Sequence, residues 1–391
     1  MAEPSDIEKI RKKRRRKALL GRILLLFLLT FLGVGIYALK DEVSATGITN
    51  FFQDIAVSSG KGSGYPLEFA GDQMRGTYAV GKNLAVLTDS NLYFYNETGK
   101  EIRSLQHKYS NPVVRINGSR VLVYDMGGKK LRVESLSRTQ VQKELDFPIY
   151  AGDISSRGDV AVATGAQRRL AEMTVYDHML SEPAKYKFKS AENYITDIKF
   201  SAAGREIAVA AVNVSDGELA SSVLIFKLKE EEPICEKKLM GELIHTVKAA
   251  RDGFCVVTDS RSLVLSYSGE QKGEYSYNYR ALSSFDYNAA GCTALLFGDY
   301  RESKNGQLVL LSADGAELWS KEVSANARLL RIGGDRVSVV VDGELQSYDL
   351  GGVLADKKSL DKEAFALQPV GGSLYIITPD SIEKIEISQK N

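Results

Sequence analysis

Histidine, cysteine and tryptophan are scarce in this chain of 391 residues, which has three His, three Cys and one Trp. His107, His178 and His245 lie far apart, and none forms an H-x-x-x-H or H-x-H pattern with acidic neighbours, so there is no zinc motif. No G-x-S-x-G elbow, Cys-His signature or nucleotide-binding loop is present either. The sequence therefore predicts no catalytic residue, no metal and no cofactor, and it favours a binding protein over an enzyme.

The cysteines are too few and too widely spaced for a disulfide framework. Cys255 and Cys292 lie in the apolar runs FCVV and CTALLF, where a thiol acts as a small hydrophobic side chain. A secreted eukaryotic domain of this size is more often disulfide-bonded, so the composition favours a bacterial surface protein, of Gram-positive type.

Only one long apolar run occurs, and it follows a basic cluster. Twelve of the seventeen residues from Ile23 to Leu39 are Leu, Ile, Phe or Val, and none is charged. Inserting such a helix into a bilayer gains about 4–7 kcal/mol. Residues 1–22 contain nine Lys/Arg against three acidic residues, which predicts a cytoplasmic N-terminus. The cluster is expected to contact anionic lipid through Arg11, Lys12, Lys13, Arg14, Arg15, Arg16 and Lys17.

This layout predicts a single-pass protein of the cell membrane. It has a cytoplasmic tail over 1–22, a transmembrane helix over 23–39, a flexible Gly/Ser-containing linker over 40–65 and an extracytoplasmic domain over 66–391. Two alternatives stay open: a signal peptide cleaved near Val43-Ser44-Ala45, and a basic patch for nuclear import or nucleic acid. After position 40 the chain has 41 Lys/Arg and 47 Asp/Glu, a balance that argues against a nucleic-acid partner.

From about Leu67 the sequence repeats with a period of 36 to 47 residues. Each repeat has an apolar run that we interpret as the inner strand of a unit, followed by a polar turn and a further strand. These runs are 84–88, 120–124, 160–164, 207–212, 254–258, 293–297, 337–341 and 374–378. No amphipathic helix of ten residues interrupts the series. The pattern predicts an all-β fold, a β-propeller of eight blades, with seven as the alternative.

The last repeat, from Ala364 to Ser388, has room for three strands only. We expect residues Pro66 to Ala70 to supply its missing outer strand and to close the ring, since an open edge would expose unpaired backbone groups.

Turn motifs bring in a resemblance. An apolar residue, Ser or Asn, two variable residues and Gly recur at Ile154–Gly158, Phe200–Gly204 and Tyr287–Gly291, which resembles the first hairpin of WD40-type propellers. Gly99-Lys100-Glu101-Ile102 and Gly315-Ala316-Glu317-Leu318-Trp319 resemble the last hairpin of quinoprotein-type repeats, although Arg103 stands where the first blade would have Trp. Overall the chain resembles uncharacterised membrane-anchored propeller proteins of Gram-positive bacteria, and this resemblance implies a fold and a location but no activity.

Two long connections between neighbouring strands give the positional clue to a binding surface. They run from Asn213 to Ser222 and from Gly298 to Gln307, and a shorter one from Gly165 to Arg169 lies in the adjacent repeat. We expect all three on one face of the ring, forming a patch for a protein partner. Its candidate residues are Arg168, Arg169, Asn213, Asp216, Glu218, Asp299, Tyr300, Arg301 and Lys304.

Two further groups of residues are weaker candidates. Tyr275, Tyr277 and Tyr279 alternate and would share one face of a strand, where they either stack on a sugar or peptide or pack on a blade edge. Asp153 and Asp286 occupy matching hairpin positions, where they either face a central channel or accept bonds from turn amides.

The sequence thus favours a membrane-tethered adaptor or scaffold of the cell envelope. The alternatives are a hydrolase or lyase of an envelope polysaccharide and a carbohydrate-binding module without catalysis.

Overall fold

A computed structural model describes residues 53–69, 72–167, 169–181, 184–186, 193–215, 217–298 and 305–386, together with Thr30. The predicted lipid-contacting cluster and the predicted transmembrane helix, Ile23 to Leu39, lie outside the described residues, apart from Thr30. Among those that are described, no helix combines the length and the apolar character that a membrane crossing requires.

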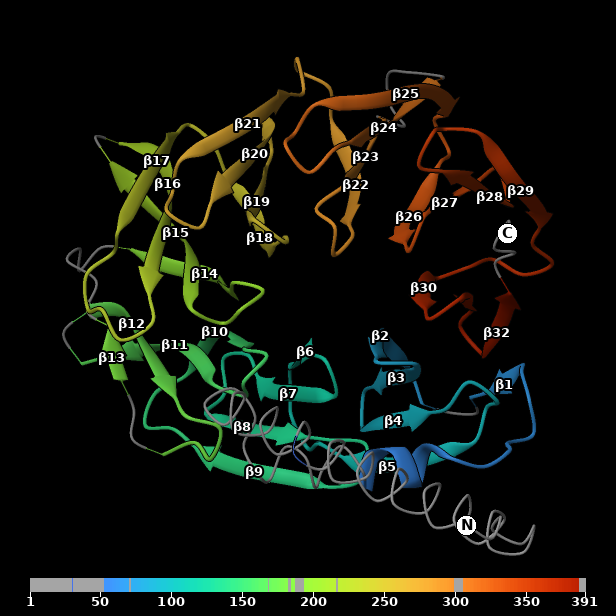
Figure 1. Cartoon of the computed structure of the whole chain (residues 1–391), viewed down its shortest axis with the longest axis horizontal. Coiled ribbons are helices and arrows are strands. Elements are labelled where there is room, and N and C mark those ends of the chain that lie inside the picture. Colours follow the sequence, from blue (N-terminus) through green and yellow to red (C-terminus); the bar gives the residue numbers. More distant parts are fainter. Residues whose placement is uncertain are drawn as a thin grey trace, which may run out of the picture. The chain divides into compact units, whose positions relative to one another are not determined.

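The compact unit from Gln53 onward contains eight four-stranded antiparallel sheets arranged around an axis, one sheet to a blade (Figure 1). Blades 1 to 4 are β2 (Met74–Val80), β3 (Asn83–Thr88), β4 (Asn91–Tyr95), β5 (Glu101–Gln106); β6 (Pro112–Asn117), β7 (Arg120–Asp125), β8 (Lys130–Glu134), β9 (Thr139–Glu144); β10 (Ile149–Ile154), β11 (Val160–Ala166), β12 (Arg169–Tyr176), β13 (Ala184–Tyr186); and β14 (Tyr194–Phe200), β15 (Glu206–Ser215), β16 (Glu218–Lys227), β17 (Cys235–Met240). Blades 5 to 7 are β18 (Ile244–Ala249), β19 (Gly253–Thr258), β20 (Arg261–Ser266), β21 (Gln271–Ser276); β22 (Leu282–Tyr287), β23 (Thr293–Phe297), β24 (Asn305–Leu311), β25 (Glu317–Ser324); and β26 (Arg328–Gly333), β27 (Arg336–Val341), β28 (Glu344–Asp349), β29 (Leu354–Ser359).

Blade 8 closes the ring as the sequence predicted. It consists of β30 (Ala366–Val370), β31 (Ser373–Ile377), β32 (Ser381–Glu386) and the N-terminal β1 (Leu67–Glu68), which pairs antiparallel with β32. The first and last strands of the ring therefore share one sheet. The prediction of eight blades is confirmed, and the seven-blade alternative is wrong.

The position of the apolar runs within the blades was predicted wrongly. Each run that we interpreted as an inner strand is the second strand of its blade, such as β3, β7 and β11. The second strand is the most apolar because neighbouring blades cover both of its faces, and every residue of Gly253–Thr258 and Arg336–Val341 is buried. The first strand borders the axis and can carry polar side chains.

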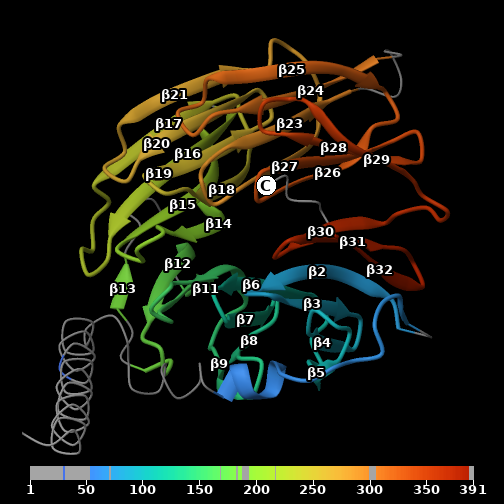
Figure 2. The same cartoon turned by 45° about the vertical axis from the view of Figure 1, so that its right-hand side comes forward.

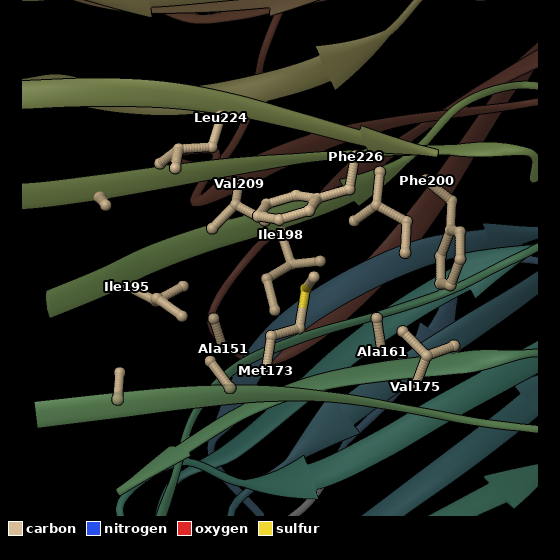
Figure 3. Packing of buried hydrophobic residues seen from close by; sticks show 14 residues of the cluster. Ala151, Ala161, Met173, Val175, Ile195, Ile198, Phe200, Val209, Leu224 and Phe226 are labelled. Atoms are coloured by element: carbon tan, nitrogen blue, oxygen red, sulfur yellow. The ribbon is translucent and has the colours of Figure 1, made fainter. Parts of the chain in front are cut away.

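The core consists of apolar layers between adjacent blades. Figure 3 shows the layer between blades 3 and 4, where Met173, Ile198 and Phe226 lie between the two sheets and Phe200 lies at one end. All four side chains are at most 1% exposed, and burying each one stabilises the fold by about 1.5–3 kcal/mol. Each blade is thus held by its two neighbours.

The turn motifs lie where the resemblances placed them. Gly158, Gly204 and Gly291 have φ of 93°, 66° and 97° and close hairpins between first and second strands. In the last hairpin of blade 6, Trp319 Nε1 donates to Leu350 O of the next blade at 3.0 Å. Arg103 occupies the equivalent place in blade 1 and likewise reaches the next blade, where its Nη1 lies 2.9 Å from Glu134 Oε2. Arginine thus replaces tryptophan as the link between blades.

The ring has two faces that differ in their connections. Because the strands of a blade alternate in direction, the first and third turns lie at one end and the second turn and the link to the next blade at the other. We call the end with the second turn and the link to the next blade the hairpin face. The end with the first and third turns is the strap face.

The strap face takes its name from residues 53–65, which we call the strap. The strap begins with a helix over residues 53–58, drawn in blue in Figures 1 and 2, and it lies on third turns of blades 1 and 2. Asp54 Oδ1 accepts a hydrogen bond from Ser137 N at 3.0 Å. Asn96 Nδ2 donates to Ser58 O and Gly60 O at 3.0 and 2.9 Å. The described part of the predicted linker, residues 53–65, is therefore hydrogen-bonded to the ring, whereas residues 40–52 lie outside the described residues.

Candidate functional site

A long hairpin of blade 4 dominates the hairpin face. β15 and β16 are ten residues each and stay paired to the last residues, Ser215 and Glu218, with Gly217 at a φ of 82° in the turn. We predicted a long loop from Asn213 to Ser222, and the structure corrects this. Alternating β-forming residues such as Val212 and Val214 continue the ladder, which satisfies backbone groups that a loop would leave to water.

The tip of this hairpin extends beyond the other two strands of blade 4. β14 pairs with β15 only as far as Val212, and β17 pairs with β16 only as far as Ala220. Among the described residues, no further strand of this sheet pairs with the residues beyond these points, so the tip offers side chains and strand edges to the outside.

Exposed apolar side chains gather around the base and tip of the hairpin. We call this set the hairpin patch: Tyr194, Val214, Leu219, Met240 and Leu243, which are 39 to 67% exposed. Val214 and Leu219 are paired across the hairpin and share one face of the sheet with Tyr194, whereas Met240 lies on the other face. Gly241 N donates to Leu219 O at 2.8 Å. Solvent-exposed apolar groups that cluster in this way mark interaction surfaces.

The predicted partner-binding residues fall partly on this hairpin. Asn213 lies on β15 and is half-buried, and no described residue is a hydrogen-bond partner of its buried Oδ1. Glu218 begins β16 and is exposed. The backbone of Arg169 begins β12, at the second turn of blade 3, and so lies at the hairpin face as expected. The remaining predicted residues, Arg168, Asp216, Asp299, Tyr300, Arg301 and Lys304, lie outside the described residues.

A pocket of about 680 Å³ adjoins the hairpin patch, and no sequence pattern indicated it. Gly241 and Glu242, which follow Met240, form one wall, and the link between blades 5 and 6 forms the other. Arg261 pairs with Glu242 at 2.5 Å and with Glu274 at 3.1 Å. Burial raises the pKa of Glu242, but hydrogen bonds from Arg261 and Ser260 outweigh it, so the net shift is downward. The pocket is polar and charged, next to an apolar surface.

The tyrosine run does not form one stripe, because strand β21 ends at Ser276. Tyr277 is fully buried, and Tyr275 donates a hydrogen bond to Glu317 at 2.7 Å. Asn278 and Tyr279 have φ of 50° and 66°, and this left-handed turn leaves Tyr279 fully exposed at the pocket rim. The packing interpretation holds for Tyr275 and Tyr277, whereas Tyr279 belongs to the surface of the hairpin face. Left-handed backbone is unusual for tyrosine and is found more often at functional positions.

Each of the two aspartates accepts a hydrogen bond from a backbone amide of the adjacent blade. Asp153 accepts from Phe200 N and Asp286 from Ile332 N, each at 2.9 Å. Asp197, which sequence reasoning missed, accepts from Val247 N at 3.1 Å. Each carboxylate thus joins the first strand of its own blade to the first strand of the next blade.

Neither His107 nor His245 belongs to the hairpin patch or to the adjoining pocket. His107 is buried, with Nε2 3.1 Å from Thr88 O, and His245 is exposed and stacked on Phe285. In the part of the chain that the structure describes, no group of three or more His, Cys, Asp or Glu is arranged to hold a metal ion.

Solved structures with the same fold are numerous. BamB from Moraxella catarrhalis aligns with a TM-score of 0.55 at 13% identity, over 82% of this chain and 98% of that one. The Cps50 (Swd1) β-propeller domain of Myceliophthora thermophila aligns with a TM-score of 0.52 at 13% identity, over the same shares. A prolyl endopeptidase aligns with a TM-score of 0.52 at 12% identity, over 80% of this chain but only 53% of that one. At these identities the likeness concerns the fold alone.

Comparison with curated proteins gives no significant match. Residues 65–387 match a family described as "Family of unknown function (DUF5711)". Because this match spans the whole ring, the chain belongs to the DUF5711 family.

Proposed function

We propose that this protein is a membrane-tethered, extracytoplasmic adaptor that binds another protein of the cell envelope through the hairpin patch. The observation that carries the proposal is the gathering of five exposed apolar side chains at one end of blade 4. A soluble domain gains no stability from such a group, whereas a partner that covers it removes apolar surface from water.

The strap does not cover this surface. It lies on the strap face, on turns of blades 1 and 2, and so leaves the hairpin patch at the other end of the ring accessible to a partner.

The chemistry of the surface defines the partner. An apolar centre beside the charged pocket of Glu242 and Arg261 has the composition of a transient protein interface, with a desolvated core and a polar rim. Tyr279 and Arg280 at the rim belong to the residue types that dominate binding energy at such interfaces. We therefore propose a folded protein partner that presents an apolar ridge, and not a polyanion.

Replacing three patch residues together, Val214→Ser, Leu219→Ser and Met240→Gln, should weaken partner binding at least 10-fold. The melting temperature should stay within about 2 °C, because substitutions at exposed positions change stability little. The measurement is quantitative affinity purification of the full-length protein after crosslinking in cells, with the recovered partner then titrated against both purified proteins.

A matched control carries Leu318→Ser, Val353→Ser and Leu354→Ser, three apolar residues of similar exposure on outer strands or turns of blades 6 and 7. The control should bind like the wild type. Equal loss of binding in both triple variants would mean that general surface polarity matters and not the hairpin patch.

Membrane attachment is tested separately. The full-length protein should stay in the membrane pellet after alkaline carbonate washing, and protease added outside intact cells should reach the ring but not residues 1–22. A variant with Leu25→Lys and Leu29→Lys should lose the attachment, since each central lysine costs about 3 kcal/mol. Recovery of the wild type in the soluble fraction would contradict the tether.

A further inference from the structure

Polar side chains from five consecutive blades converge at the axis of the ring. We call them the axial cluster: Arg115 of β6, Asp153 of β10, Asp197 of β14, Lys199 of β14, Lys248 of β18 and Tyr287 of β22. The inner strands that carry them lie around the centre in Figure 1. Arg115 Nη2 lies 3.6 Å from Asp197 Oδ1, although blades 2 and 4 are not neighbours. A contact that skips a blade requires both side chains to reach the axis.

The cluster is accessible to solvent. The side chain of Arg115 is 35% exposed, that of Lys199 is 19% exposed, and Lys248 and Tyr287 are half-buried. A small molecule that enters along the axis can therefore reach these groups.

The carboxylates of the cluster are already engaged. Asp153 accepts from Lys199 Nζ and from Phe200 N, both at 2.9 Å. Asp197 accepts from Thr246 Oγ1 at 2.9 Å and from Val247 N at 3.1 Å. Their strongest bonds fix the inner strands to one another, so little acceptor capacity remains for the other cations.

Lys248 and Arg115, in contrast, have hydrogen-bond donors that no close protein acceptor uses. Lys248 Nζ lies 5.1 Å from the centre of the Tyr287 ring, and within the described residues no carboxylate oxygen lies within 4 Å of it. Arg115 has only long contacts, at 3.6 Å to Asp197 and 3.4 Å to Val114 O. Three ammonium protons and most of a guanidinium thus lack a close acceptor from the protein.

Electrostatics shows that Lys248 is poorly compensated. Burial is the largest cause that lowers its pKa. Asp197 opposes this effect, whereas the positive charges of Lys199 and Arg115 add to it. Asp286 also interacts with Lys248, but the interaction of its carboxylate with Arg331 is larger, and the carboxylate accepts a hydrogen bond from Ile332 N.

We infer that the axial cluster binds an oxyanion, a phosphate or carboxylate group of a small molecule, between Lys248, Arg115 and Lys199. Charge-assisted hydrogen bonds to such a group would supply the acceptors that the protein lacks, in a partly desolvated place where they are strong. The site lies in the later half of the inner strands, towards the strap face, and is separate from the hairpin patch. The inference does not depend on the proposed adaptor function.

The test measures binding of inorganic phosphate and of succinate to the purified full-length protein, by calorimetry and by the rise in melting temperature. Sodium chloride at matched ionic strength serves as the reference. We expect saturable binding of at least one of the two anions above that reference, and the preferred one identifies the oxyanion class. Lys248→Met should weaken this binding at least 10-fold, and Lys248→Arg should retain it.

The unliganded Lys248→Met protein provides a second readout. Since the folded-state pKa of Lys248 is lowered, its positive charge destabilises the fold at neutral pH, and this penalty is lost as the pH rises from that pKa to the ordinary pKa of lysine in the unfolded chain. Methionine should therefore leave the melting temperature unchanged or raise it. Anion binding of equal strength in Lys248→Met and wild type, or no binding beyond the chloride reference, would overturn the inference.

Discussion

Asp153→Ala should lower the free energy of unfolding by about 3–5 kcal/mol, the largest effect that we expect from a single substitution. The Asp153 side chain is fully buried and pairs with Lys199 at 2.9 Å. Alanine leaves the ammonium without its partner and also leaves Phe200 N without an acceptor. Both losses occur at the contact between blades 3 and 4, so the whole ring should be affected.

Chemical denaturation of the full-length protein measures this effect. Two further variants serve as comparisons. Asp153→Asn keeps an acceptor for Phe200 N but no charge, and should be intermediate. Glu144→Ala breaks an exposed ion pair with Lys130, at 3.9 Å, and should cost less than about 1 kcal/mol. A loss at Asp153→Ala as small as that at Glu144→Ala would show that the axial ion pair contributes nothing to holding the blades together.

Asn96→Ala should release the strap and cost about 2–3 kcal/mol. The Asn96 amide donates to Ser58 O and Gly60 O, and its Oδ1 accepts from Thr98 N and Lys100 N at 3.0 Å each. The residue is buried, so its removal leaves several backbone groups without partners.

Trypsin offers a local readout, because Lys61 is an exposed residue in the middle of the strap. Cleavage there requires the strap to open, and we expect it to be at least 10-fold faster in Asn96→Ala. Asn117→Ala is the matched control, since Asn117 also lies at a hairpin but makes one bond between blades, from Nδ2 to Ile154 O at 3.2 Å. Equal cleavage rates in both variants would contradict a bound strap.

The number of blades and the closure of the ring could be predicted because both depend on local, repeated signals. Each second strand contains an apolar run, many turns carry a Gly with positive φ, and the last repeat is one strand short. The order of the strands within a blade, counted from the axis, could not be predicted in this way. An apolar strand shows that both of its faces are covered but not where it lies in the sheet.

The candidate sites depend on contacts between blades, and periodicity gives no information about these. Asp197 lies two positions away from the place in its hairpin that Asp153 occupies, so aligning the repeats does not reveal it. The contact between Arg115 and Asp197 joins blades that are separated in both sequence and ring order. The strap was misjudged for the same reason, since its Gly/Ser composition is typical of a linker, whereas Asn96 and Ser137 in distant turns hold it.

The most direct test of the account is site-specific photo-crosslinking in intact cells, with a photoreactive residue at Leu219 of the full-length protein. The same residue at Leu318, which is similarly exposed on β25, is the control. We expect light to produce a discrete protein adduct at Leu219 and none at Leu318. No adduct at Leu219, or the same adducts at both positions, would contradict the claim that the hairpin patch binds a partner.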